Sequence, residues 1–106
     1  MKINKLKEIT VLSNRLKIVW NKDHSGGSFD LSKGIMEIGT QHIKSDPLYV
    51  LQTISHELME LILGMMGGRY ESPRIVNQYL FNFNHQTFEN AIELHTQILT
   101  QFIKTK

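Results

Sequence analysis

One long helix, delimited at both ends by its own sequence, constrains this fold more than any other feature. Asp46 followed by Pro47 is typical of a helix start, because aspartate caps free N–H groups and proline suits the first helical position. Gly67-Gly68 is typical of a helix end, since glycine readily adopts the left-handed conformation. We therefore predict a helix from Pro47 to about Met66, with an apolar face formed by Leu51, Ile54, Leu58, Leu61, Ile62 and Met65.

The first 40 residues predict a small meandering sheet. Residues 1–14 suit either a strand with a turn at Asn14-Arg15 or a short helix, because both periodicities are present. The next strand is clearer, since its apolar residues alternate with polar ones and share one face: Leu16, Ile18 and Trp20. Residues 21–27 have the composition of a loop, and short strands are expected around residues 28–31 and 35–38.

The last part of the chain predicts a second helix, from His85 to about Ile103, with Asn84 as its cap. Its apolar face is expected to contain Phe88, Ala91, Ile92, Ile98, Leu99 and Phe102. Between the helices we expect a loop over residues 69–76 and an extended segment over residues 79–83. The predicted fold is α+β: one domain over residues 1–106, with a small mixed or antiparallel sheet packed on two helices.

Composition and charge exclude several classes of protein. Twelve Lys+Arg and ten Asp+Glu leave a net charge of +2, and the basic residues are scattered, so we expect no nucleic-acid partner. No apolar run approaches the length of a membrane span, and we expect no membrane partner. The chain has no cysteine, so any metal ligand must be His, Asp or Glu. The lack of cysteine is compatible with the cytoplasm, which is the location we expect.

The motif with the clearest chemical meaning is His56-Glu57-x-x-Glu60, in the middle of the first helix. It differs by one residue from the His-Glu-x-x-His motif of zinc metallopeptidases. Residues His56 and Glu60 lie one turn apart on the same face, so both can bind one ion. Glu57 is rotated by about 100° and can reach a water molecule on that ion as a general base.

The second helix offers another pair at the same spacing, His85 and Glu89, at the margin of its apolar face. If the two helices face each other, both pairs can surround one point. Either His85 or Glu89 then becomes the third ligand, and His85 is preferred because two histidines and one glutamate form a workable zinc site. With Glu89 instead, two carboxylates suit a harder metal such as manganese.

The order of these elements resembles the small zincin-like metallopeptidases of the ImmA/IrrE kind, which occur in phages and mobile elements. The residues that carry the resemblance, within residues 16–100, are Ile18–Trp20, Gly27–Asp30, Ile35–Ile38, Leu51–Leu58, Glu89-Asn90-Ala91 and Leu94. The resemblance implies a metal-dependent peptidase with a zinc ion and with Glu57 as the base. This chain departs from the family at Glu60, which stands where the family has its second histidine.

Two functions from different classes follow. The first is a zinc-dependent peptidase acting on a peptide or protein. The second is a non-catalytic module of phage or mobile-element origin, which binds metal or a protein partner and keeps the zincin fold. The sequence does not indicate the oligomeric state.

A substrate peptide is expected to add as an extra strand to residues 35–39, if these form the rim of the cleft and not an interior strand. Gly39 would then allow the close approach of a second backbone. Three further histidines have simpler interpretations: His95 as a hydrogen-bonded core residue, and His24 and His42 as loop residues.

Overall fold

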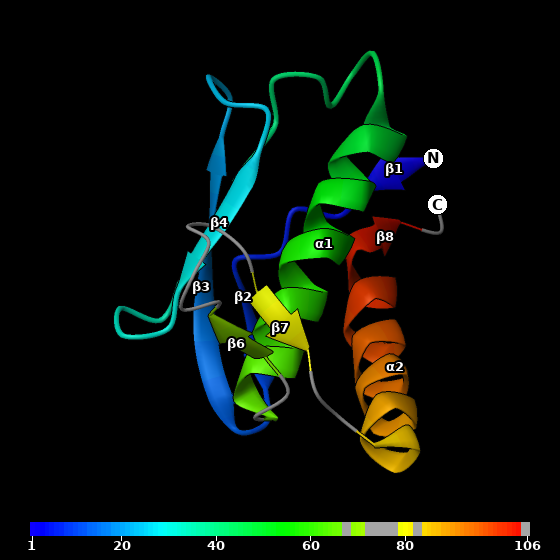
Figure 1. The fold of residues 1–106 in the computed structure, drawn as a ribbon. Coiled ribbons are helices and arrows are strands. Elements are labelled where there is room, and N and C mark those ends of the chain that lie inside the picture. Colours follow the sequence, from blue (N-terminus) through cyan, green and yellow to red (C-terminus); the bar gives the residue numbers. More distant parts are fainter. Residues whose placement is uncertain (67–68, 72–78, 82–83, 105–106) are drawn as a thin grey trace.

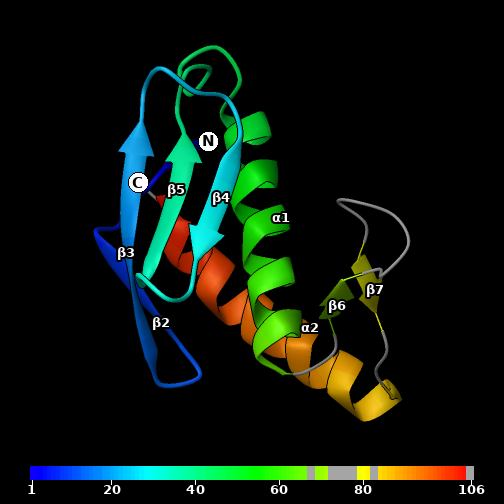
Figure 2. The same ribbon diagram turned by 60° about the vertical axis from the view of Figure 1, so that its left-hand side comes forward.

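The computed structural model describes residues 1–66, 69–71, 79–81 and 84–104 (Figure 1). A four-stranded sheet lies on one side of helix α1 (Pro47–Met65), and helix α2 (His85–Leu99) packs against α1 (Figure 2). The helix α1 therefore contacts both the sheet and the second helix. This arrangement confirms the predicted α+β class.

A tight hairpin joins the first two strands of this sheet, β2 (Glu8–Val11) and β3 (Asn14–Asn21). The turn is formed by Leu12 and Ser13, whose φ angles are 48° and 68°. The predicted turn at Asn14-Arg15 is therefore wrong, and residues 8–11 are extended, not helical. Asn14 supports the turn from the first position of β3, because its side-chain amide donates a hydrogen bond to the Leu12 carbonyl at 3.0 Å.

The sheet is not a simple meander, because its last strand in sequence is inserted into its interior. The strand order is β2-β3-β5-β4, where β4 spans Gly27–Asp30 and β5 spans Ile35–Gly39. Strand β5 pairs with β3 in parallel and with β4 antiparallel. The prediction that residues 35–39 form the rim is wrong, and β4 lies at the edge of the sheet instead.

Gly39, the last residue of β5, allows a close contact with another segment of the same chain. A Cβ atom at Gly39 would overlap the carbonyl oxygen of His24, which belongs to the loop between β3 and β4. The Gln41 N–H also donates to this carbonyl oxygen, at 3.0 Å. The close backbone approach expected at Gly39 therefore exists, but the partner is a loop of the same chain and not a bound peptide.

Helix α1 begins and ends as its sequence predicts, to within one residue. The Asp46 carboxylate accepts a hydrogen bond from the Tyr49 N–H at 3.2 Å, and Pro47 occupies the first position. Its buried surface is wider than the predicted apolar face, since it includes Leu63 and Glu57, because α1 packs between the sheet and α2. The full buried set is Val50, Ile54, Glu57, Leu58, Leu61, Ile62 and Leu63.

Helix α2 begins at the predicted cap but ends four residues early. The Asn84 side chain accepts a hydrogen bond from the Thr87 N–H at 2.8 Å. After Leu99 the chain tightens into a 3₁₀ turn, η1 (Thr100–Phe102), and continues as β8 (Ile103–Lys104). Strand β8 pairs antiparallel with β1 (Lys2–Ile3), so residues 103–104 belong to a two-stranded sheet and not to the helix.

The apolar face predicted for α2 is only partly buried. Ala91, Ile98 and Phe102 are buried, and the Phe102 ring makes an edge contact with Trp20 at a centroid distance of 6.1 Å. Phe88 and Ile92, by contrast, are 43% and 41% exposed. Periodicity identified the helix correctly but not the width of its buried stripe.

Between the helices, β6 (Arg69–Glu71) pairs antiparallel with β7 (Tyr79–Phe81). The prediction of a loop is therefore wrong for residues 69–71, and the predicted extended segment is confirmed for residues 79–81. The predicted helix end at Gly67-Gly68, the loop over residues 72–76 and the extended residues 82–83 lie outside the described residues.

In the described part of the chain, neither helix combines the length and the apolar character that a bilayer crossing requires.

Candidate metal centre

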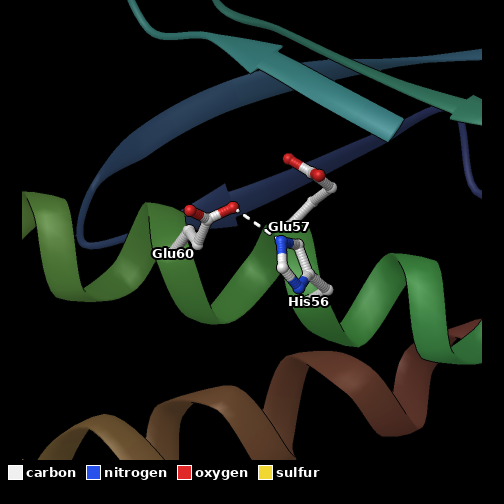
Figure 3. Close-up of side chains that lie close together, drawn as sticks. All are labelled: His56, Glu57 and Glu60. Carbon is white, nitrogen blue, oxygen red and sulfur yellow. Dashed lines mark ion pairs between the residues drawn. The ribbon is translucent and has the colours of Figure 1, made fainter. Parts of the chain in front are cut away.

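The polar side chains of the predicted motif lie within little more than one turn of α1. The His56 Nε2 lies 2.9 Å from a carboxylate oxygen of Glu60, one turn further along the helix (Figure 3). The His56 side chain is 68% exposed and that of Glu60 is 19% exposed. The predicted pair is therefore formed, with the imidazole facing solvent and the carboxylate largely covered.

Glu57 lies differently from both neighbours, because it points toward the strands and not to solvent (Figure 3). It is 9% exposed, and it is one of two buried polar residues among those described. A Cβ atom on Gly27 would lie 2.9 Å from the Glu57 Cγ and 3.0 Å from the Thr53 Cγ2. Glycine at the start of β4 therefore allows the edge strand to pack directly on this side chain.

The three side chains form one compact group of possible ligands. One ligand atom each from His56, Glu57 and Glu60 lies within 4.8 Å of the others. Zinc–nitrogen and zinc–oxygen bonds of about 2.0–2.2 Å place two tetrahedral ligand atoms about 3.3 Å apart. The 2.9 Å contact between His56 and Glu60 needs to widen by only a few tenths of an ångström to admit an ion. The donor set therefore fits a divalent metal.

A pocket of about 280 Å³ opens beside this group. Its lining comes from the beginning of β4 and from one face of α1: Gly26, Gly27, Gln52, Thr53, His56 and Glu57. Two of the three possible ligands thus face a space that a small molecule or a peptide side chain can enter. His56, Glu57 and Glu60 could supply at most three ligands from one helix, so an ion held by them would leave coordination sites for water or substrate, as catalytic metal sites do.

The second predicted pair is formed as well, but it is not part of this group. The His85 Nδ1 lies 3.5 Å from a Glu89 carboxylate oxygen, and the two side chains are 83% and 58% exposed. Among the described residues, the group of possible ligands contains His56, Glu57 and Glu60 and neither member of the α2 pair. The structure therefore does not bring the two pairs around one point.

His95 joins the two helices immediately next to the motif. Its Nε2 lies 3.0 Å from the Ser55 hydroxyl oxygen and 3.2 Å from the Ser55 carbonyl oxygen. With the proton on Nε2 the ring donates to Ser55, and with the proton on Nδ1 it accepts from the hydroxyl. The prediction of a hydrogen-bonded histidine is confirmed, although the residue is half-buried and not fully in the core.

Sequence reasoning did not identify Gly27 and Thr53 as parts of this site. A glycine within a strand indicates a close approach of backbone or ligand, so Gly27 carried a usable signal. The residues that Gly27 contacts depend on which strand lies at the edge of the sheet. Strand order is set by the tertiary fold and cannot be read from the local sequence.

No protein-family model matches the chain, and neither a curated protein nor a solved structure matches it. The resemblance to the ImmA/IrrE proteins thus stays a prediction from the residues.

Proposed function

We propose that this protein is a metal-dependent peptidase-like hydrolase, in which His56 and Glu60 bind the ion and Glu57 acts on water as the general base. One observation carries the proposal. The three side chains form a compact group of possible ligands beside an open pocket, and Glu57 is the buried member of that group. A buried carboxylate next to a metal is suited to proton transfer, because its position is held by packing.

The proposed metal is zinc, with manganese as the alternative. One imidazole and one or two carboxylates form a harder donor set than the two histidines of the usual motif, and such a set accommodates manganese better than the two-histidine set does. A ligand role for His85 or Glu89 remains a prediction of the sequence alone. The ion would supply Lewis-acid activation of the water and of the substrate carbonyl.

The role of the chain in hydrolysis is then proton transfer by Glu57. Its carboxylate accepts a proton from the water as the water oxygen attacks the carbonyl carbon. It returns this proton to the departing nitrogen as the C–N bond breaks, so the reaction leaves the enzyme unchanged.

The proposed substrate is a peptide or protein segment in extended form. Among the strands of the described residues, β4 lies at the edge of the four-stranded sheet, and it begins at the pocket, at Gly27. An extended peptide can add to the outer side of an edge strand as a further strand. The strand expected to do this was β5, and β4 takes over that role in this proposal. A cytoplasmic location belongs to the proposal, on the basis of the cysteine-free sequence.

A non-catalytic module of phage or mobile-element type is the alternative, and one observation favours it. His56 already pairs with Glu60 at 2.9 Å and is mostly exposed, which is also how a solvated ion pair on a helix surface looks.

Two measurements on the same preparation separate these functions. Chelator-treated protein is titrated calorimetrically with Zn²⁺ and with Mn²⁺ at neutral pH, and the metal-loaded protein is then incubated with a fluorogenic peptide library. The proposed function predicts one saturable site, with weaker affinity at lower pH because the ligands must lose protons, together with cleavage that a chelator abolishes. Metal binding without cleavage supports the module, and no saturable site contradicts both the peptidase and a metal-binding module.

A further inference from the structure

A second pocket lies where the two ends of the chain meet the loop that precedes α1. Its volume is about 400 Å³, and it is lined by Met1, Lys2, Ile3, Ile43, Lys44, Pro47 and Lys104. None of these residues lines the pocket beside His56. His56 lies nine residues beyond Pro47 on α1, roughly 13 Å along the helix at 1.5 Å per residue, so the two pockets are separate sites.

Three lysines surround this second pocket. Lys2 and Lys104 are direct partners in the antiparallel pairing of β1 and β8, and Lys44 comes from the loop before α1. Like charges directly opposite each other on paired strands are destabilising. No ion pair found in the described part of the chain includes any of the three lysines. Among the described residues, the fold therefore brings three lysines to one pocket, and no aspartate or glutamate is part of the lining found there.

The remaining lining is apolar. Ile3 is 8% exposed and belongs to the core, and Ile43 packs against the core and is partly buried. With Pro47 these residues give the pocket an apolar surface, and the volume is within the usual range for small-molecule sites. A cationic rim combined with an apolar surface is complementary to a ligand with an anionic head and an apolar portion.

We infer that this pocket, which we call the lysine pocket, binds a small organic phosphate monoester. Three ammonium groups suit a phosphate head, because it carries close to two negative charges and several acceptor oxygens, and lysine binds phosphate as a point charge. The apolar portion of the ligand lies on Ile3, Ile43 and Pro47. This inference does not depend on the proposed hydrolase activity.

The test uses three probes on the full chain, followed by ¹⁵N chemical-shift titration. Hexyl phosphate contains both parts of the proposed ligand, inorganic phosphate has only the head, and hexanol has only the apolar part. Hexyl phosphate is expected to saturate, with shifts confined to the residues of the lysine pocket, and to bind at least several-fold more tightly than either other probe.

A charge-matched pair of variants identifies the site. Replacing Lys2→Gln and Lys104→Gln together is expected to weaken hexyl phosphate binding about fivefold, since each exposed charge pair contributes modestly. The control is Lys22→Gln with Lys33→Gln, which removes the same charge from loops outside the lysine pocket and should leave binding unchanged. An unaltered thermal transition establishes that each variant is folded.

Three results would overturn the inference. The first is no saturable shift with hexyl phosphate, and the second is equal weakening in both double variants, which indicates nonspecific attraction by net charge. The third is tighter binding of a short single-stranded oligonucleotide than of hexyl phosphate, with shifts that spread beyond the lysine pocket, because this assigns the lysines to a nucleic acid.

Discussion

The two helices carry the same pair of residue types at the same spacing, and among the described residues only the α1 pair belongs to a group of possible metal ligands. His56 and Glu60 on α1 are 2.9 Å apart, and His85 and Glu89 on α2 are 3.5 Å apart. The Glu60 side chain is 19% exposed, whereas that of Glu89 is 58% exposed. Spacing on a helix thus brings a histidine and a glutamate together in both cases, but it does not by itself build a site.

The difference between the pairs arises from what lies over each helix. The edge strand β4 packs on α1 at Gly27, buries Glu57 and forms one wall of the pocket. Among the described residues, the group of possible ligands therefore includes a second carboxylate on α1, that of Glu57, and neither member of the α2 pair. The α2 pair serves as a built-in control for the α1 pair in each of the experiments below.

The largest effect is expected at Glu57. Replacing Glu57→Gln keeps the shape of the side chain but removes its ability to accept a proton, so peptide hydrolysis should fall by roughly 10²–10⁴-fold. Glu89→Gln is the matched control on α2 and should retain full turnover. Metal affinity is measured on the same samples, and a loss of metal in Glu57→Gln would identify Glu57 as a ligand and not as the base.

A smaller effect is expected when one histidine is removed. His56→Ala deletes a ligand and should weaken Zn²⁺ or Mn²⁺ affinity by about 100-fold, since even the residues that support ligands contribute 10- to 100-fold. His85→Ala should change affinity by less than about twofold on this account. Calorimetric titration of both variants measures the difference, and an equal loss in the two would mean that the α2 pair does reach the ion.

The packing of β4 on α1 can be tested without any assumption about activity. Gly27→Ala places a methyl group against Glu57 and Thr53 and should lower the free energy of unfolding by about 1–3 kcal/mol. Gly26→Ala is the matched control, because nothing lies within 4 Å of a Cβ atom there, and its cost should stay within about 0.5 kcal/mol. Urea unfolding measures both values, and equal costs would refute the close contact between β4 and the site.

The smallest effect concerns the link between the helices. His95→Ala removes the contact with Ser55 and should lower the free energy of unfolding by about 1 kcal/mol, the usual net value of one hydrogen bond. Thr96→Ala, at the neighbouring exposed position, should have little effect. A His95→Ala protein with wild-type stability would show that the bridge to Ser55 does not support α1.

Local signals in the sequence predicted the helices well. Asp46, Pro47 and Asn84 cap or begin the two helices as expected, because capping depends only on residues within one turn. The alternating residues of β3 were also assigned correctly, since Leu16 and Ile18 are buried. The His56–Glu60 pair followed from the helical period alone.

Properties that depend on distant parts of the chain were not predictable in this way. The insertion of β5 between β3 and β4 is a pairing between segments far apart in sequence, and it turned the expected rim strand into an interior one. The burial of Glu57 depends on that strand order, because β4 covers it. The three lysines around the second pocket appeared scattered in the sequence, but the pairing of β1 with β8 brings Lys2 beside Lys104, and the loop before α1 adds Lys44.

Anomalous diffraction from crystals grown with Zn²⁺ or Mn²⁺ tests the central claim most directly. The account predicts one anomalous peak per chain, about 2.0–2.2 Å from the His56 Nε2 and from a Glu60 oxygen. The 2.9 Å pair should open to admit the ion, and Glu57 should lie beside it. A peak between His85 and Glu89, or no peak on α1 at saturating metal, would contradict the account.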